Sequence, residues 1–124
     1  MNGASEVLGG GKAAGLPDPI RLARGAADEA VPYLLDAGLK RALFVADETT
    51  ARVIGSRLAE RYGAAGGAAR LEIIRPNAAG DVVADEASVL QAIIAAQHHS
   101  ADAIAAAGSG TIHDIVRYAA CTLG

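Results

Sequence analysis

The sequence contains very few aromatic residues. It has no Trp, one Phe and three Tyr among 124 residues, although 52% of its residues are hydrophobic. Large rings normally supply much of the buried area of a core, so this core has to rely on Val, Ile and Leu with Ala and Gly between them. The length fits one domain. We expect secondary-structure layers that pack closely through small side chains.

The sequence also lacks paired cysteines, a long apolar run and an excess of basic residues. Its single cysteine, Cys121, excludes an internal disulfide, and we interpret it as a small buried thiol on the last helix. No apolar run has the length of a membrane span and no secretory signal opens the chain, which favours a cytoplasmic protein. A net charge of −3 and a pI near 5.5 argue against nucleic acid as a partner.

The order of the predicted elements is typical of an α/β fold. Residues 1–17 are rich in Gly and Ala without a sustained period, so we expect a flexible leader before one folded domain at 18–124. Alternating strands and helices favour a Rossmann-like parallel sheet with helices on both faces. The strands are expected at 19–23, 42–46, 71–75 and 103–107, and the helices at 26–37, 50–62, 87–97 and after residue 110.

Apolar residues three and four positions apart define the expected buried face of each helix. Pro32 predicts that the first helix starts late or bends, and Gly38 predicts where it ends. The apolar positions of the next three helices are Val53, Ile54, Leu58 and perhaps Tyr62, then Val89, Leu90, Ile93 and Ile94, and finally Ile112, Ile115, Val116 and Ala119.

The most informative segment follows the last expected strand. Gly108-Ser109-Gly110-Thr111 separates that strand from a helix. The first amides of a helix lack internal partners and lie at the positive end of its dipole, so they suit a pyrophosphate. The glycines permit a sharp turn and a close approach, while the hydroxyls offer a helix cap. The alternative is an ordinary turn, because short Gly-x-Gly turns are common and His113 replaces the third glycine of the usual dinucleotide fingerprint.

An acidic residue follows the strand at 42–46. Asp47 is therefore well placed to accept hydrogen bonds from the hydroxyls of an adenosine ribose. The alternative is a cap for the helix at 50–62. A carboxylate there repels the 2′-phosphate of NADP, which favours NAD as the cofactor. This preference is weak, because Arg52 or Arg75 could lie close enough to offset the repulsion.

The sequence predicts no metal site of its own. His98 and His99 are adjacent on a helix, where their side chains point about 100° apart, and no Asp, Glu or His follows at helical spacing. They suit the end of a helix, where the dipole favours positive charge.

The block GSGTIHD at 108–114, followed by IVRY at 115–118, resembles that of sn-glycerol-1-phosphate dehydrogenases, especially their bacterial members. These enzymes are relatives of glycerol dehydrogenase, dehydroquinate synthase and the iron-containing alcohol dehydrogenases. The likeness extends over 18–124, and its specific parts are the glycine block and the Asp47 segment. The resemblance also implies that Asp114 lies near the substrate; the alternative is a favourable charge at the helix N-terminus. The residues assigned to the cofactor are Asp47, Gly108, Ser109, Gly110, Thr111 and Ile112.

The resemblance implies a larger enzyme than this chain. In that family a helical domain follows the nucleotide-binding domain and holds a divalent metal, Zn, Ni or Fe, through one Asp and two His. We therefore expect an incomplete sheet, metal ligands outside residues 1–124 and no activity from this chain alone. The implied reaction is hydride transfer between NAD or NADP and dihydroxyacetone phosphate or sn-glycerol 1-phosphate, in a homo-oligomer. The alternatives are a glycerol or polyol dehydrogenase, a dehydroquinate synthase-like enzyme, or a small non-catalytic nucleotide-binding module.

Overall fold

Three parallel strands form the centre of the molecule. The computed structural model describes residues 7–8, 20–21 and 26–123. Strand β3 (Arg41–Ala46) lies between β4 (Ala68–Ile73) and β5 (Ala103–Ala106), and both neighbours run parallel to it. The expected strand at 71–75 thus begins earlier, at Ala68. Parallel neighbours joined through helices confirm the predicted α/β architecture with an open sheet.

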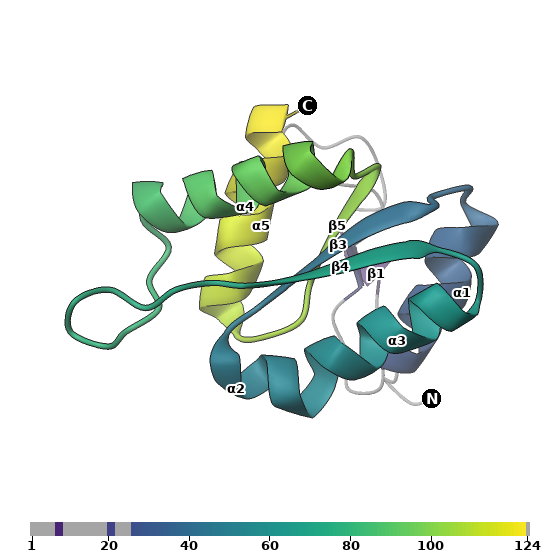
Figure 1. The fold of residues 1–124 in the computed structure, drawn as a ribbon, viewed down its shortest axis with the longest axis horizontal. Helices are drawn as coiled ribbons and strands as arrows, with labels where there is room; N and C mark the ends of the chain where they lie inside the picture. Colours follow the sequence, from purple (N-terminus) through teal and green to yellow (C-terminus); the bar gives the residue numbers. More distant parts are fainter. Residues whose placement is uncertain (1–6, 9–19, 22–25, 124) are drawn as a thin grey trace.

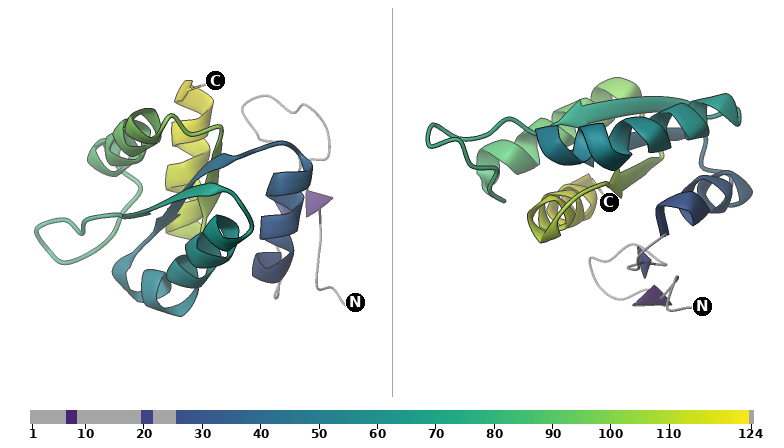
Figure 2. Two further views of the ribbon diagram at one scale, coloured as in Figure 1. Left: turned by 45° about the vertical axis from the view of Figure 1, so that its right-hand side comes forward. Right: turned by 90° about the horizontal axis from the view of Figure 1, so that it is seen from below.

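The first expected strand does not join this sheet. Its described part is β2 (Ile20–Arg21), which pairs antiparallel with β1 (Val7–Leu8). Figure 2 shows this short pair on the α1 side of the molecule, apart from the three parallel strands. The prediction of a fourth parallel strand is therefore wrong for Ile20–Arg21. Apart from Val7–Leu8, the expected leader lies outside the described residues.

Helices cover both faces of the sheet (Figure 1). One face carries α4 and α5, and the other carries α1 and a continuous helical stretch of α2, a π-helical turn η1 and α3. No helix in the described part of the chain is long and apolar enough to cross a membrane. The helix bounds are α1 (Ala26–Asp36), α2 (Glu48–Thr50), η1 (Ala51–Gly55), α3 (Ser56–Ala64), α4 (Glu86–His99) and α5 (Gly110–Leu123).

The core consists of two apolar clusters divided by β3. Leu43 and Val45 point into the cluster beneath α4 and α5, whereas Phe44 points into the cluster beneath α1 and α3. This alternation follows from the two-residue period of a strand. The ring of Phe44 packs edge-on against that of Tyr62, with centroids 5.5 Å apart. The expected stripe on α5 is confirmed, because its four apolar positions are buried, but Cys121 is exposed and its predicted burial is wrong.

A π-helical turn changes the buried face of the second predicted helix. The backbone N–H of Ser56 donates to the carbonyl of Ala51, which places an extra residue in the turn. As a result Val53 is 73% exposed, and its predicted burial is wrong. Gly55 takes the buried position, where an added Cβ would stand 3.1 Å from a methyl group of Leu71. The glycine therefore lets this helical stretch lie directly on β4.

Small residues, rather than the largest apolar ones, bury α4 against the sheet. Ala92, Ala95 and Ala96 are buried, whereas Leu90 and Ile94 are 51% and 45% exposed. The helix was expected to use Leu90 and Ile94 in packing, and this detail is wrong. Alanines permit a short distance between helix and sheet, which rotates the bulkier neighbours outward.

The end of α1 follows the glycine signal in the sequence. Gly38 has a φ of +80°, a conformation that favours glycine. Its N–H donates to the carbonyl of Leu35, and the N–H of Leu39 donates to that of Leu34. These two bonds form a Schellman cap. The helix begins at Ala26, as the range 26–37 predicts, so of the two effects expected from Pro32 the late start is wrong.

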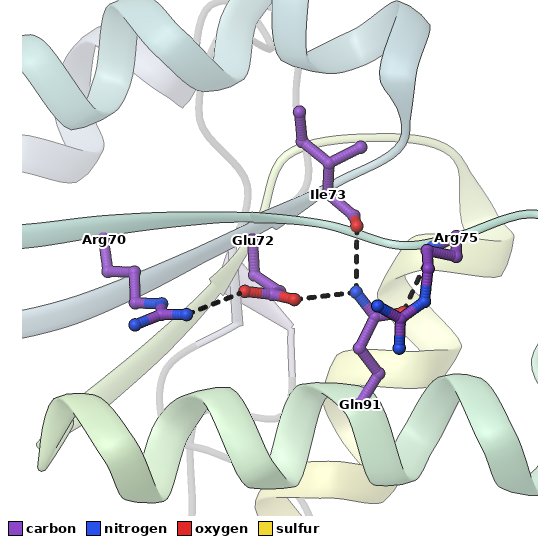
Figure 3. Close-up of polar contacts among 5 residues, drawn as sticks. All are labelled: Arg70, Glu72, Ile73, Arg75 and Gln91. Carbon is purple, nitrogen blue, oxygen red and sulfur yellow. Dashed lines mark hydrogen bonds and ion pairs between the residues drawn. The ribbon is translucent and has the colours of Figure 1, made fainter.

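Hydrogen bonds from one α4 side chain close the carboxyl end of the β4 edge (Figure 3). Ile74 donates to β3, so the carbonyl of Ile73 and the N–H of Arg75 point to the opposite side. Gln91 Nε2 donates to that carbonyl at 2.9 Å, and Gln91 Oε1 accepts from Arg75 at 3.1 Å. The same amide donates to Glu72 at 2.7 Å. The side chain thus takes the place of a residue in a further parallel strand, which protects this part of the edge.

A second polar cluster joins the amino ends of all three strands. Asp102 accepts from the backbone N–H groups of Lys40 and Arg41 through its two different oxygens, each at 2.9 Å. Arg41 Nε donates to the carbonyl of His99, and His99 Nε2 contacts the carbonyl of Ala68 at 2.8 Å. Segments before β3, β4 and β5 are therefore held together by their own polar groups.

Candidate functional site

The carboxyl edge of the sheet brings the two predicted cofactor segments together. Asp47 follows β3 directly, and Gly108 comes shortly after the neighbouring strand β5. Figure 1 shows the starts of α2 and α5 at this same edge. A Cβ added to Gly108 would stand 3.1 Å from Thr50 Oγ1, so the two segments are in contact. Ligands of open parallel sheets bind at this edge.

Asp47 is the N-cap of the helical stretch that begins at Glu48. Its Oδ1 accepts from the backbone N–H of Thr50 at 2.8 Å and from Thr50 Oγ1 at 3.0 Å. The Asp47 N–H donates back to Thr50 Oγ1 at 3.0 Å, which completes a capping box. The capping alternative is therefore confirmed. It leaves Oδ2 without a hydrogen bond to any described residue, so the carboxylate keeps one oxygen for a ligand.

The structure gives different explanations for the two glycines of the turn. An added Cβ at Gly108 would lie 2.9 Å from Ile112 Cγ1, a fully buried side chain, so close packing requires this glycine. At Gly110 an added Cβ would meet no atom within 4 Å. Gly110 is exposed and lies at the first position of α5. Internal packing therefore explains Gly108, whereas Gly110 faces open space that a ligand could fill.

The start of α5 offers backbone donors at this edge. The N–H of His113 donates to the carbonyl of Ser109 at 3.0 Å, and this is the first bond of the helix. The amides of Gly110, Thr111 and Ile112 precede that bond, so they have no partner within the helix. Ser109 and Gly110 are exposed, and Thr111 is half-buried. The Ile112 side chain is fully buried, so Ile112 can serve a ligand only through its backbone.

Asp114 lies just beyond the first turn of α5 and forms an ion pair with Arg117, three residues later. Both side chains are close to half exposed. A surface pair of this kind adds little stability. The first turn of α5 contains no acidic residue, so the alternative role of Asp114 as a charge at the helix N-terminus is not supported. The expected proximity of Asp114 to a substrate remains a prediction.

A separate polar hollow of about 190 Å³ lies between the end of β4 and the start of α4. Its lining includes Arg75, Gln91 and the capping pair Asp85 and Ser88, and it contains none of the predicted site residues. Asp85 Oδ1 accepts from the N–H of Ser88 at 2.9 Å. This backbone hydrogen bond, followed by one from the Ser88 side chain, lowers the pKa of Asp85.

The described residues contain no group of three His, Cys, Asp or Glu that could hold a metal ion. His99 is instead in contact with the carbonyl of Ala68. The donor set at the carboxyl edge, by contrast, consists of amides, hydroxyls and one carboxylate, which suits the phosphates and sugar hydroxyls of a nucleotide.

The sequence pattern alone does not assign Thr50 to the site. In the structure it lies between Asp47 and Gly108 and contacts both segments. The available signal was the Asp-x-x-Thr spacing, which is typical of a helix cap whose third residue returns a hydrogen bond to the first. That pattern predicts the contact with Asp47, but the contact with Gly108 depends on the tertiary structure.

Comparison with known proteins shows the family to which the chain belongs. Residues 21–124 match the family described as iron-containing alcohol dehydrogenase. A glycerol-1-phosphate dehydrogenase [NAD(P)+] of Bacillus subtilis (strain 168) is 40% identical over 103 residues, which are 83% of this chain and 26% of the relative. The enzyme of the same name from Bacillus licheniformis is 36% identical over 108 residues, 86% of this chain and 26% of the relative. No solved structure matched the chain.

A third relative with this name, from Geobacillus stearothermophilus, is 32% identical over 88 residues, 71% of this chain and 22% of the relative. The chain therefore spans about a quarter of the length of these relatives. The shared part contains both the Asp47 segment and the glycine turn, since the family match begins at residue 21.

Proposed function

Because the chain belongs to the iron-containing alcohol dehydrogenase family, we propose that it is the dinucleotide-binding portion of a metal-dependent sn-glycerol-1-phosphate dehydrogenase. The relatives at 32–40% identity bear the name glycerol-1-phosphate dehydrogenase [NAD(P)+]. The reaction of such an enzyme interconverts sn-glycerol 1-phosphate and dihydroxyacetone phosphate. Since the chain covers about a quarter of those relatives, its own part in that reaction is cofactor binding.

One observation carries the proposal. Asp47 and Gly108 meet through Thr50 at the carboxyl edge of two neighbouring strands, next to the open amides of α5. The dipole of α5 and its three amides favour an anion at this place. Asp47 Oδ2 makes no hydrogen bond to a described residue and would accept one from a hydroxyl. This combination of an anion site and a nearby acceptor suits a nucleotide better than an isolated phosphate.

In this proposal the chain binds and orients the cofactor. Amides of Gly110, Thr111 and Ile112 bind the pyrophosphate, and the hydroxyls of Ser109 and Thr111 border it. Asp47 binds the adenosine ribose, which favours NAD over NADP because a carboxylate repels a 2′-phosphate. The Gly108 turn brings the backbone close to the phosphates. When bound, the nicotinamide would exchange a hydride with the substrate carbon.

The remaining chemistry belongs to parts of a relative that this chain does not cover. We propose that a divalent metal, Zn, Ni or Fe, lies there and polarises the substrate oxygen as a Lewis acid. Asp114 would face the substrate from the amino-terminal half of α5. We also propose a cytoplasmic homo-oligomer that has no nucleic-acid partner, in line with the composition and net charge.

Calorimetric titration of the 124-residue chain tests the proposal. NAD⁺ and ADP-ribose are expected to bind, AMP more weakly because it lacks the second phosphate, and NADP⁺ more weakly than NAD⁺. Asp47→Ala should weaken NAD⁺ about tenfold through the lost charged hydrogen bond and should reduce the difference between NAD⁺ and NADP⁺. A preference for AMP would favour a non-catalytic nucleotide-binding module, and an absence of binding would overturn the cofactor assignment for this chain.

An activity assay adds an independent test. The chain alone is expected to oxidise no NADH in the presence of dihydroxyacetone phosphate and divalent metal, because the metal ligands are assigned to a different part of the enzyme. Turnover by the 124 residues would contradict the proposal that the metal ligands lie in a different part of the enzyme. The assay needs a full-length relative as a positive control.

A further inference from the structure

Thr50 contacts both halves of the proposed nucleotide site. It is half-buried at the end of α2, within a helical stretch that continues to Ala64. Its Oγ1 is hydrogen-bonded to Asp47 and lies 3.1 Å from the position of an added Cβ at Gly108. These two segments are far apart in sequence, so their contact through Thr50 depends on the tertiary structure.

The hydroxyl of Thr50 determines how Asp47 is presented. A hydroxyl has one proton to donate and can also accept. Thr50 Oγ1 accepts from the Asp47 N–H at 3.0 Å, and its proton goes to Asp47 Oδ1, also at 3.0 Å, rather than to the carbonyl at 3.4 Å. The Thr50 N–H donates to the same Oδ1. With Oδ1 held from two directions, the carboxylate has one orientation and Oδ2 is the oxygen that remains available.

The contact with Gly108 fixes the distance between the two segments. There is no room for a methyl group between Thr50 Oγ1 and the Gly108 backbone, because Ile112 closes the other side at 2.9 Å. The glycine turn is therefore held between Thr50 and a fully buried residue of α5. The position of the α5 amides depends on that packing.

We propose that Thr50 is a positioning residue that orients Asp47 for the ribose while it holds the glycine turn at a matching distance for the pyrophosphate. The inference rests on the proposed function and adds a residue that acts through Asp47 rather than by touching the cofactor. It explains why a hydroxyl-bearing side chain suits this place: the Oγ1 that is hydrogen-bonded to Asp47 is also the Thr50 atom that lies against Gly108.

Two near-isosteric variants of the 124-residue chain separate these roles. Thr50→Val keeps the shape against Gly108 and removes the hydroxyl, and it should raise the Kd for NAD⁺ about tenfold. Thr50→Ser keeps the hydroxyl and should stay within about twofold of the original chain. In an Asp47→Ala background, Thr50→Val should cause no further loss, because the group through which it acts has been removed. A merely structural role would give additive losses.

The control variant is Asp102→Asn, which weakens hydrogen bonds at the opposite end of the sheet. It should lower the urea midpoint and leave the Kd for NAD⁺ unchanged. Equal NAD⁺ affinity for the original chain and Thr50→Val would overturn the inference while the proposed function stands.

A measurement without ligand keeps the two ideas distinct. Three-bond NMR couplings of Asp47 report its χ1 angle, and they should indicate one rotamer in the original chain and averaging in Thr50→Val. Couplings that are averaged in both chains, or unchanged by the substitution, would overturn the positioning role even if no nucleotide binds. The Asp47 rotamer could be fixed in the original chain and averaged in Thr50→Val although the chain binds no NAD⁺. That result would support the orientation of Asp47 by Thr50 and overturn the cofactor assignment.

Discussion

The two ends of the sheet each carry an aspartate beside a strand, and the two aspartates are used differently. At the amino end Asp102 engages both carboxylate oxygens with the backbone of Lys40 and Arg41. At the carboxyl end Asp47 engages only Oδ1, with Thr50, while Oδ2 makes no hydrogen bond to a described residue. The same side chain thus completes the fold at one end and keeps a free acceptor at the other.

This difference follows from the direction of the elements. In a parallel α/β sheet, helices begin at the carboxyl edge, so their open amides gather there. The amino edge instead receives helix C-termini, and here the carbonyl of His99 is already bonded to Arg41. The polar groups described at the amino edge form hydrogen bonds with one another, whereas Asp47 Oδ2 and the first amides of α5 at the carboxyl edge remain available for a ligand. We therefore expect substitutions at the amino edge to affect stability and those at the carboxyl edge to affect binding.

The largest loss of stability is expected from Asp102→Ala. It leaves two backbone N–H groups without their acceptor and should lower the free energy of unfolding by about 3 kcal/mol. Urea unfolding followed by circular dichroism measures this change. NAD⁺ affinity, measured below the unfolding transition, should not change. A large loss of affinity in a folded Asp102→Ala chain would show that the two edges are not independent.

Gly108→Ala is expected to affect both properties. The new methyl group would meet Ile112 and Thr50 at 2.9 to 3.1 Å, and overpacking of this kind should cost about 2 kcal/mol. The start of α5 has to move to accept it, so NAD⁺ affinity should fall by more than about tenfold. Unfolding and calorimetric titration on the same preparation measure the two effects. Unchanged stability would mean that the close packing at Gly108 relaxes without strain.

The sequence predicts the sheet well where one local pattern dominates. The run at 42–46 is apolar on both faces, and all five of its residues are buried in the central strand β3. The periodic stripe from Ile112 to Ala119 likewise predicts the buried face of α5. The errors arise where tertiary contacts decide. The π-helical turn at Ala51–Gly55 places Gly55 on β4 and turns Val53 outward, and nothing in the local spacing indicates the extra residue.

The sequence predicts the two segments of the candidate site, but it does not predict the contact that Thr50 makes between them. Asp47 and the glycine turn each have a recognisable position after a strand, and neighbouring strands bring them to one edge. The role of Thr50 depends on a contact between positions 50 and 108, which no helical or strand period connects. The sequence also cannot tell which glycine is needed for packing and which faces open space. Only the surroundings of Gly108 and Gly110 make that distinction.

A smaller effect is expected from the tyrosine that supports the amino edge. Tyr62 is fully buried and donates to the carbonyl of Leu39 at 2.6 Å. Burial raises the pKa of Tyr62, and the negative charge of Asp102 adds to the shift. A raised pKa means that this contribution to stability is present below the unfolded value of about 10 and is lost as the pH rises through the folded value. Tyr62→Phe should cost about 1 kcal/mol at neutral pH.

The same variant should also remove part of the alkaline sensitivity. Urea midpoints measured from pH 7 to 11 should fall less steeply for Tyr62→Phe than for the original chain, because the phenol no longer ionises. Parallel curves for the two chains would show that the Tyr62 hydroxyl is not coupled to folding in this range.

The smallest change in stability, and the sharpest separation of the two edges, is expected from Gly110→Ala. An added Cβ meets no atom within 4 Å, and alanine favours a helix over glycine, so stability should rise by about 0.5 kcal/mol. If the α5 amides approach a pyrophosphate, the same methyl group stands in its way and the Kd for NAD⁺ should rise about tenfold.

Gly63→Ala is the matched control, since Gly63 is also helical with open space around it but lies in the last turn of α3, close to the start of β4. It should gain similar stability without loss of affinity. If Gly110→Ala and Gly63→Ala bind NAD⁺ equally well, the open space at Gly110 is not occupied by the ligand. That result would contradict a phosphate site at the start of α5.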